Sequence, residues 1–443
     1  MTPIRGIGVR SAAALVAANM IGAGVFTTSG YALADLGSPI PVLIAWAVGG
    51  VIALCGALSY AGLAARIPGN GGEYLFLSRA VHPLAGFLAG WISLLAGFTA
   101  PIAVAAHGLE AYAQGAFGLD LPAGLLGASA IILAGITHGI ARAPGLRIQD
   151  AAVAVKLIAI IAFIVVGAVV LAGADTTDSS PLQSGPVSIS AFAVTLVWIS
   201  FAYSGWNAAV YISGELEDPS RTLPRAMIVA TLGVSAIYIA LNAVFLFSAP
   251  VEALAGKAEI GAIAAEALGG WWARGALSGV VALGLLTSIS AMVMVGPRVY
   301  AQMAEDGVFP RILGADGEAP HRAIALQVGL ALVAFFISDL RDLLLYVGFL
   351  LGISASATVA CLFLPVGRVG GRVSSVPGAP WVPILFIVTT LGSAGFLVLR
   401  QPAQAAAGLA TLGIGVVVYW LSRRSRLTPH VRPRGRDRSP LPK

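Results

Sequence analysis

The segment MIGAGVF, residues 20–26, lies in the middle of the first long apolar run of the chain, near residues 10–35. A run of this length can cross a bilayer as a helix, but glycine is among the weakest helix formers, and Gly22 and Gly24 are only one residue apart. A broken backbone persists in hydrocarbon only where it lines a cavity or is buried in protein. Close helix packing is the alternative role for the two glycines, but their spacing differs from the small-xxx-small pattern. The segment therefore predicts a functional break in a membrane helix.

The composition of the whole chain is that of a polytopic membrane protein. Of its 443 residues, 58% are hydrophobic and only 10% are charged, whereas soluble domains contain about 25% charged residues. These values exclude disorder, and the sequence lacks the alternating ten-residue pattern of a membrane β-barrel. We expect an all-α membrane protein with twelve spans, near residues 10–35, 40–65, 82–107, 123–142, 149–173, 188–213, 225–249, 275–303, 321–338, 341–366, 380–399 and 402–421.

Arginine and lysine are divided unevenly between the two sides of these spans. Of the 26 Lys and Arg residues, 21 fall on the side that contains both termini, and Lys156 lies inside a span. The other side holds only Lys257, Arg274, Arg341 and Arg400. Because cytoplasmic loops carry the excess of positive charge, we expect a multi-pass protein of the cell membrane with both termini in the cytoplasm. We expect the basic tail, residues 422–443, to be a solvated flank that touches anionic lipid rather than a nucleic-acid-binding arm.

The segment SFAYSGWN, residues 200–207, predicts a second break, in the middle of the sixth span. The first and sixth spans occupy matching positions in two successive units of five spans, and interrupted helices at corresponding positions indicate a transporter site. The free N–H groups at the start of a half-helix can bind a carboxylate. The free carbonyl groups of the other half-helix suit an ammonium group. Two such breaks can therefore bind a zwitterion without a charged side chain.

Several motifs in the same order resemble those of the amino acid–polyamine–organocation (APC) superfamily of amino acid permeases. The segment IGAGVF, residues 21–26, is similar to the IGxGIF signature of that superfamily, and FAYSGWN, residues 201–207, is similar to a segment of the L-type amino acid transporters. Further matches are Gly37-Ser38-Pro39, Gly71-Gly72-Glu73-Tyr74, Pro297-Arg298 and Asp306-Gly307-Val308-Phe309-Pro310. The resemblance extends over roughly residues 10–365.

The resemblance implies a LeuT-type fold with two inverted repeats of five helices and two extra helices. The expected parts are a cytoplasmic N-terminus (1–9), the first repeat (10–173), the second repeat (188–366), helices eleven and twelve (380–421) and the basic tail (422–443).

The resemblance also implies roles for residues at the two breaks. The expected substrate-binding residues are Met20, Ile21, Gly22, Ala23, Gly24, Phe201, Ala202 and Ser204. Among them, the N–H groups of Ala23 and Gly24 would face the substrate carboxylate, and the carbonyl groups of Met20, Phe201 and Ser204 would face its amino group. The ring of Phe201 would close over the substrate as a gate. Many relatives have serine at the position of Ala23, so this chain lacks one hydroxyl contact, which implies weaker binding or a smaller substrate.

Lys156 is the only lysine inside a predicted span. An ionisable side chain within a membrane helix is a candidate functional group, although a lysine near the surface can extend its ammonium group to the cytoplasmic interface. Proton-coupled relatives have a lysine in the fifth helix where sodium-coupled ones bind a cation, and Lys156 is similar. A desolvated lysine can load and release a proton. We therefore expect Lys156 to couple transport to protons and transport to be independent of sodium.

Three further residues are weaker candidates for the site: Tyr203, Asn207 and Ser288. Core packing also explains Tyr203, as it does Trp206. Ser288, with Thr287 and Ser290, could face Lys156 or the substrate, but hydroxyl groups inside helices usually bond to their own backbone.

Two carboxylates, Glu73 and Glu215, fall at cytoplasmic helix ends. They are expected either to form ion pairs with Arg66 or Arg298 as part of a gate or to be solvated flanks.

These features predict a secondary active transporter of neutral amino acids that works by alternating access and is either proton-coupled or an exchanger. No Asp or Glu lies in the middle of the first, third, sixth, eighth or tenth span, which favours neutral substrates, although cation–π recognition leaves cationic ones open. The alternatives are an amine or amino acid antiporter or exporter and, from a different class, a substrate-sensing receptor on a transporter scaffold. A selectivity-filter run such as TVGYG is missing, as is a catalytic cluster of His, Asp, Glu or Cys in the spans, so neither a channel nor an enzyme is expected.

The expected partners are a small-molecule amino acid, protons and the lipid bilayer, with no cofactor, metal ion or nucleic acid. Cys55 and Cys361 both lie in apolar runs and are expected to pack as small hydrophobic residues. Animal L-type light chains use a cysteine between the third and fourth spans to join a glycoprotein. The corresponding loop, about residues 108–122, has no cysteine, so no disulfide-linked heavy subunit is expected.

Overall fold

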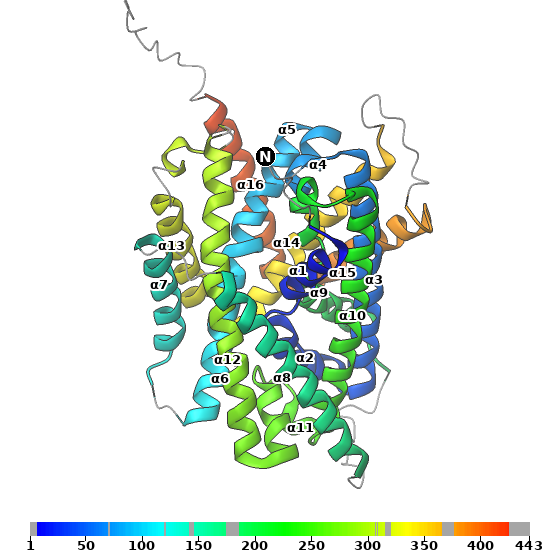
Figure 1. Cartoon of the computed structure of the whole chain (residues 1–443), viewed down its shortest axis with the longest axis vertical. Coiled ribbons are helices and arrows are strands. Elements are labelled where there is room, and N and C mark those ends of the chain that lie inside the picture. Colours follow the sequence, from blue (N-terminus) through cyan, green and yellow to red (C-terminus); the bar gives the residue numbers. More distant parts are fainter. Residues whose placement is uncertain are drawn as a thin grey trace, which may run out of the picture.

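The computed structural model describes residues 7–69, 71–118, 121–140, 146–173, 186–305, 307, 309–314, 320–365 and 376–424. All regular elements of these residues are helices, apart from an isolated β-bridge between Ile7 and Leu216. Most of the long helices run roughly along the long axis of the molecule (Figure 1). The predicted all-α class is confirmed.

The helices follow one another along the chain as α1 (Val9–Met20), α2 (Gly24–Leu36), α3 (Pro39–Arg66), α4 (Gly72–Ala80), α5 (Pro83–Ile92), the π-helix η1 (Ser93–Thr99), α6 (Ala100–Phe117), α7 (Leu125–Ile140), α8 (Leu146–Gly173), α9 (Ile189–Ala202), the 3₁₀ helix η2 (Ala208–Glu215), α10 (Pro219–Phe247), α11 (Val251–Leu254), α12 (Ile260–Glu305), η3 (Arg311–Leu313), α13 (His321–Ile337), α14 (Leu340–Ala360), η4 (Cys361–Phe363), α15 (Trp381–Arg400) and α16 (Pro402–Arg424).

Most of the predicted spans correspond to long apolar helices. The described residues contain eight helical segments that are long and apolar enough to cross a membrane, and the bent pair α1–α2 makes a ninth. The shorter apolar helices α7, α9 and α13 lie at the fourth, sixth and ninth predicted spans. The membrane fold is therefore confirmed, while the count of twelve spans and the division into inverted repeats stay predictions. Residues 1–6, Asp306, Val308 and the tail from residue 425 lie outside the described residues.

The first predicted break divides the first span into two helices. Helix α1 ends at Met20, α2 begins at Gly24, and the two axes differ by 46°. Residues 21–23 between them have bent rather than helical backbone. Because the first N–H groups and the last carbonyl groups of a helix have no partner within it, this arrangement places free backbone dipoles in the middle of the span.

The broken helices lie inside the bundle. Helix α1 packs against α10, and α2 packs against α9. Helix α9 is further enclosed by α3, α14 and α15. Figure 1 shows α1 and α9 near the centre of the view, with α8, α12 and α10 around them. The core of the bundle therefore surrounds both predicted breaks.

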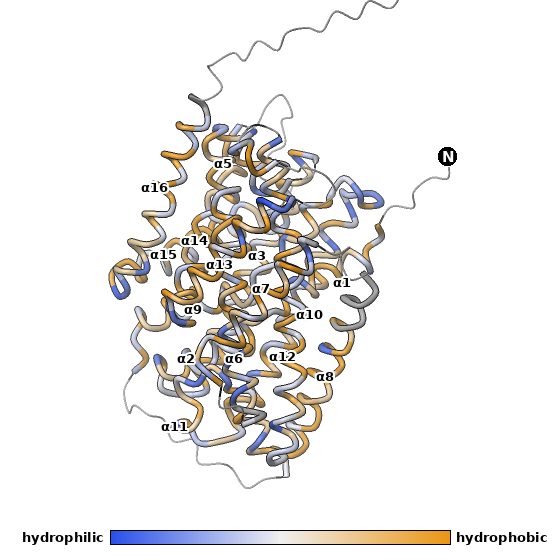
Figure 2. The backbone as a smooth tube through the Cα atoms, turned by 90° about the vertical axis from the view of Figure 1, so that its left-hand side faces the viewer, coloured by the Kyte–Doolittle hydropathy of each residue, from blue (hydrophilic) through white to orange (hydrophobic). Residues whose placement is uncertain are grey.

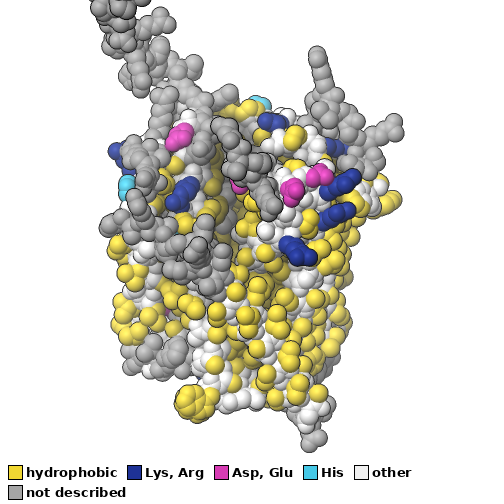
Figure 3. Space-filling model, viewed as in Figure 1, with side chains coloured by type: hydrophobic (Ala, Val, Ile, Leu, Met, Phe, Trp, Pro, Cys, Tyr) yellow, Lys and Arg dark blue, Asp and Glu magenta, His cyan; other side chains and the backbone are white. Residues whose placement is uncertain are grey.

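The outer surface of the bundle is apolar over much of its length. Hydrophobic positions continue along peripheral helices such as α8 (Figure 2), where Val165, Val166 and Val169 are exposed. On the face shown in Figure 3, hydrophobic side chains cover the middle and the lower part, whereas Lys, Arg, Asp and Glu gather toward the upper part. That end contains α4 and α5, and α11 lies at the opposite end (Figure 1). The apolar belt matches the hydrocarbon core of a bilayer, and the charged end matches its polar interface.

Candidate functional site

The two predicted breaks touch each other. Helix α9 ends at Ala202, and residues 203–207 form turns before η2 begins at Ala208. A Cβ atom added to Gly24 would lie 2.6 Å from Ala202 Cα. Gly205 has a φ of +102°, and a Cβ atom there would lie 2.7 Å from the backbone carbon of Asn19. The structure thus brings the two segments together, and both contacts depend on glycine.

Gly22 differs from these two glycines because no atom lies within 4 Å of where its Cβ would be. Its absent side chain therefore does not serve packing, and there is open space beside the break. The N–H groups of Ala23 and Gly24 lie where α2 begins, and no side chain caps that end of the helix. Uncapped N–H groups next to open space can receive an anionic group such as a carboxylate.

The carbonyl groups on the other side of the first break have side-chain donors. The Lys156 ammonium group donates to the carbonyl oxygen of Ile21. The hydroxyl oxygen of Tyr238, in α10, lies 2.6 Å from Met20 O and 3.1 Å from Ala202 O. One tyrosine therefore joins the last carbonyl of α1 to the last carbonyl of α9. Met20 O also accepts from the N–H group of Gly22 at 2.9 Å. A carbonyl oxygen has two lone pairs, so a substrate amino group would have to displace one of these two donors to bind Met20 O.

Lys156 is buried, with 6% of its surface exposed. Its side chain passes over Gly284 of α12, where an added Cβ would lie 3.1 Å from Lys156 Cδ. The ammonium group therefore does not reach the cytoplasmic interface, which was the alternative left open by the sequence. No carboxylate pairs with it among the side chains that the structure describes. Instead, its charge meets the carbonyl end of α1, where the helix dipole is negative.

Phe201 and Ser204 lie at the end of α9, where the second break begins. Phe201 is buried, and its carbonyl oxygen accepts from the N–H group of Ser204 at 2.9 Å. Ser204 itself is half-buried. All eight predicted substrate-binding residues therefore lie in or beside the two touching breaks, and whether they bind substrate stays a prediction.

The aromatic residues after Phe201 pack in the core. The ring centroid of Tyr203 lies 5.7 Å from that of Trp46 and 5.1 Å from that of Tyr238, and its hydroxyl group donates to Trp46 O at 3.0 Å. Trp206 stacks edge-on with Tyr60, with centroids 4.8 Å apart. Both contacts agree with the core-packing interpretation of these side chains.

The hydroxyl groups of Thr287, Ser288 and Ser290 in α12 already have partners. Thr287 Oγ1 and Ser288 Oγ each donate to the carbonyl oxygen of Gly284 at 2.9 Å. Ser290 Oγ lies 2.8 Å from His138 Nε2. Their bonds therefore go to their own helix or to α7 rather than to Lys156.

Glu73 has surroundings that neither sequence interpretation predicted. Its carboxylate accepts from Tyr60 Oη at 2.7 Å, Ser354 Oγ at 2.8 Å and Asn207 Nδ2 at 3.2 Å. Arg66 instead donates to Leu362 O at 2.7 Å. Arg298 donates to Met294 O. The expected ion pair with Arg66 or Arg298 is therefore wrong, and the half-buried carboxylate has three neutral donors instead of a fully solvated position. Glu215, by contrast, is exposed.

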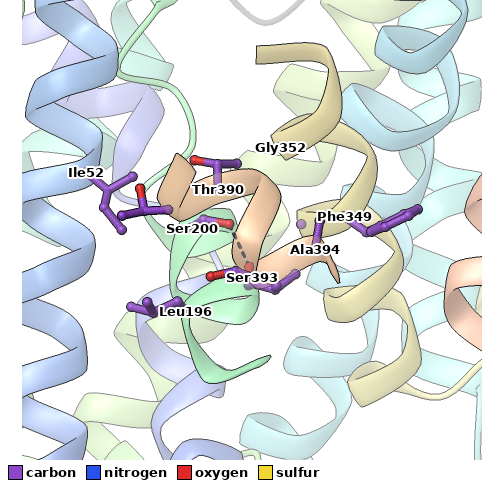
Figure 4. A pocket seen from close by; sticks show the side chains of 11 residues that line it. Ile52, Leu196, Ser200, Phe349, Gly352, Thr390, Ser393 and Ala394 are labelled. Carbon is purple, nitrogen blue, oxygen red and sulfur yellow. Dashed lines mark hydrogen bonds between the residues drawn. The ribbon is translucent and has the colours of Figure 1, made fainter. Parts of the chain in front are cut away.

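A small pocket opens on another side of α9 (Figure 4). It lies between α3, α9, α14 and α15, with Ile52, Ser200, Phe349 and Thr390 among its lining residues. Ser200 Oγ donates to Val197 O at 2.7 Å, so the hydroxyl group is already bonded. The pocket shares no residue with the α1–α2 break and is separate from the predicted substrate site.

Sequence reasoning missed Tyr238 and the partners of Glu73 as parts of the site. A tyrosine in the middle of an apolar span needs a partner for its hydroxyl group, and this signal was available for Tyr238. The sequence holds no comparable signal for Glu73, because its three donors come from distant segments.

The comparisons with known proteins agree with this geometry. Residues 7–419 match the family model described as "Amino acid permease". The chain is 29% identical over 432 residues to "Large neutral amino acids transporter small subunit 2" of Rattus norvegicus. This match covers 94% of this chain and 80% of that protein. The human protein of the same name is also 29% identical over 432 residues. Over 259 residues the chain is 31% identical to "b(0,+)-type amino acid transporter 1" of Mus musculus, covering 57% of this chain and 53% of that protein.

The chain belongs to the amino acid permease family of the APC superfamily. The resemblance noted in the sequence is therefore confirmed for the family, whose members named here are amino acid transporters.

Proposed function

We propose that this chain is a secondary active transporter of neutral amino acids that works by alternating access across the cytoplasmic membrane. The observation that carries the proposal is the contact between the two helix breaks, at Gly24 against Ala202 and at Gly205 against Asn19. Touching breaks offer N–H groups from one half-helix and carbonyl groups from another within a single site. The charges of a zwitterion can be matched there by backbone dipoles.

In this proposal the substrate carboxylate binds the N–H groups of Ala23 and Gly24, beside the open space at Gly22. The amino group binds the carbonyl oxygens of Met20, Phe201 and Ser204, and the ring of Phe201 closes over the bound substrate. No acidic side chain stands in either break, at residues 20–24 or 201–207. A cationic side chain would lack a counter-charge there, and the large neutral amino acids named for the relatives fit the same chemistry.

Lys156 supports transport without sodium. Its ammonium group supplies, at Ile21 O, the positive charge that a bound metal cation would otherwise supply. We propose that Lys156 takes part in proton coupling, with amino acid exchange as the alternative mode. An amine or amino acid antiporter or an exporter is the second candidate, since the same site can work in either direction.

The proposed orientation has both termini in the cytoplasm. Helices α4 and α5 lie at the end that the distribution of Arg and Lys assigns to the cytoplasm, and α11, followed by Lys257, lies at the other end (Figure 1). Cys55 and Cys361 are both buried. We therefore propose that the chain works without a disulfide-linked heavy subunit.

Purified protein in proteoliposomes tests the function. Uptake of labelled leucine should be the same in sodium and in potassium buffers, and a pH gradient should increase it. A thermal-shift screen against the twenty amino acids identifies the substrate class independently. If no amino acid raises the melting temperature and no neutral amino acid is taken up or exchanged, the proposed function is wrong.

A further inference from the structure

The carboxylate of Glu73 connects four separate segments of the chain. Glu73 lies in the first turn of α4, Tyr60 near the end of α3, Ser354 in α14 and Asn207 at the end of the second break. Two residues before Asn207, the backbone of Gly205 packs against Asn19 of α1. A change at this carboxylate therefore acts directly on the break that faces the proposed substrate site.

The hydrogen bonds of this cluster divide unevenly between the two carboxylate oxygens. Oε1 accepts from the Tyr60 hydroxyl group and from the Asn207 amide group, whereas Oε2 has the Ser354 hydroxyl group as its partner. An amide NH₂ group can only donate, but a hydroxyl group can donate or accept. A proton on Oε2 could therefore be donated to Ser354 Oγ while Oε1 kept both of its donors. The cluster thus accommodates a neutral carboxyl group with all three hydrogen bonds intact.

The two arginines on either side of Glu73 in the sequence donate to backbone carbonyl groups. Arg66 donates to Leu362 O at 2.7 Å, and Arg79 donates to Pro68 O at 3.4 Å. Among the elements packed against α4, η4 contributes the Cys361 thiol, which donates to Ala357 O, and the turn before α5 contributes His82, whose Nδ1 accepts from Leu84 N. The titratable side chains beside Glu73 are Tyr60, which donates to it, and Tyr211, on which the Glu73 charge acts. No guanidinium or ammonium group therefore compensates a negative charge on Glu73 among the described residues.

Burial raises the pKa of the Glu73 carboxyl group above its ordinary value, although the hydrogen bonds from Tyr60, Ser354 and Asn207 oppose this shift. Separation of the four segments would hydrate the carboxyl group and return its pKa toward the ordinary value. The closed cluster then binds the proton more tightly than the separated one. By linkage, protonation favours the closed arrangement and separation favours release of the proton.

We propose that Glu73 is a proton-binding site of the transport cycle, protonated on Oε2 while the four segments are together and deprotonated to the cytoplasm when they separate. The proposal rests on the proposed function for its direction, because release on the cytoplasmic side accompanies substrate release there. Coupling requires that the proton is loaded from the outer side while the four segments are together, because a proton taken up again from the cytoplasm would give no net transport. Glu73 is then a second proton-binding group, next to the second break, in addition to Lys156 at the first break.

The variant Glu73→Gln tests the site because glutamine resembles the neutral acid. Its carbonyl oxygen can accept from Tyr60 and Asn207, and its NH₂ group can donate to Ser354. In full-length protein, Glu73→Gln should raise the melting temperature relative to wild type at about pH 7.5 and much less at about pH 5. Folding of wild type must protonate a carboxyl group that is ionised in the unfolded chain, and this costs more the further the pH lies above the ordinary pKa of that group. The matched control is Glu215→Gln, which neutralises an exposed carboxylate and should not alter the melting temperature at either pH.

Transport gives the second readout. A gradient of about one pH unit that drives one proton supports about tenfold accumulation of leucine in wild type. Glu73→Gln should lose this accumulation but keep leucine exchange at equal pH, and Glu73→Asp, which can still titrate, should recover part of it. Glu215→Gln should accumulate leucine as wild type does.

Two results would overturn the proposal. A lower melting temperature for Glu73→Gln at about pH 7.5 would mean that the folded state prefers the ionised carboxylate. Full proton-driven accumulation in Glu73→Gln would remove Glu73 from coupling. If wild type transports no amino acid at all, the proposed function fails, while the melting temperatures still decide whether Glu73 is protonated.

Discussion

At the first break, a cation meets a carbonyl oxygen: Lys156 donates to Ile21 O at the end of α1. At the second break, a carboxylate meets neutral donors, one of which is the amide of Asn207. The charge of Lys156 is compensated by the negative end of a helix dipole, whereas the charge of Glu73 has no cationic partner among the described residues. The comparison teaches that the first break is organised around a cationic side chain bound to a backbone carbonyl group, and the second around a carboxyl group whose partners are all neutral.

The two groups also differ in where they lie. Lys156 is inside the bundle, and its side chain crosses Gly284 of α12. Glu73 lies in α4, a helix of nine residues at one end of the molecule (Figure 1). Glu73 is half-buried there, whereas Lys156 is 6% exposed and lies against α12.

Among the substitutions at the two breaks, removal of Lys156 should reduce leucine uptake most. Lys156→Ala leaves Ile21 O without its donor and deletes a charge-assisted hydrogen bond, so leucine uptake should fall about a hundredfold. The measurement is initial uptake in proteoliposomes under an imposed proton gradient. Undiminished, pH-dependent uptake by this variant would show that the first break does not need the ammonium group.

Gly24→Ala and Gly22→Ala form a matched pair at the first break. Gly24→Ala should have the next largest effect, on the stability of the protein. In Gly24→Ala the new Cβ would lie 2.6 Å from the backbone of Ala202, so one break must move away from the other, at a cost of about 1–3 kcal/mol. In Gly22→Ala the new Cβ meets nothing within 4 Å, so folding should be nearly unaffected. Melting temperatures and leucine binding measure the difference. Equal destabilisation by the two substitutions would contradict the close contact between the breaks.

The positions of the breaks could be predicted from the sequence because the causes are local. Gly22 and Gly24 weaken a helix wherever it packs, and the matching positions of the first and sixth spans suggested that the two segments work together. The partners of the breaks could not be predicted in the same way. Tyr238 and Glu73 reach them through the packing of α10 and α4, and a single sequence does not show which helix faces meet.

The ion pair predicted for Glu73 was wrong because the sequence shows charges but not which donors lie closest. A glutamate at a helix end next to arginines suggests an ion pair, but Nη1 of Arg66 donates to the backbone carbonyl of Leu362 instead. The hydroxyl groups of Tyr60 and Ser354 take its place. Charge complementarity in sequence is therefore a poor guide where neutral donors are closer.

Tyr238→Phe tests whether one hydroxyl group holds the two breaks together. The substitution leaves Met20 O and Ala202 O without this donor, and loss of a buried hydrogen bond costs about 1–3 kcal/mol. Stability should fall by this amount, and the KM for leucine should rise because the ends of α1 and α9 are no longer joined. A stable variant with wild-type KM would mean that the glycine contacts alone hold the breaks together.

Ser288→Ala should have the smallest effect, and Ser354→Ala is its matched counterpart. Both residues carry a hydroxyl group in a helix of the bundle, but Ser288 bonds to Gly284 O of its own helix at 2.9 Å, and Ser354 bonds to the Glu73 carboxylate at 2.8 Å. Removing a hydroxyl group that only bonds back to its helix changes stability by about 0.5 kcal/mol or less. Ser288→Ala should therefore transport leucine as wild type does at every pH, and Ser354→Ala should alter the pH dependence by removing the partner of Oε2. A change in pH dependence for Ser288→Ala but not for Ser354→Ala would reverse the comparison and place the exchangeable proton near Lys156.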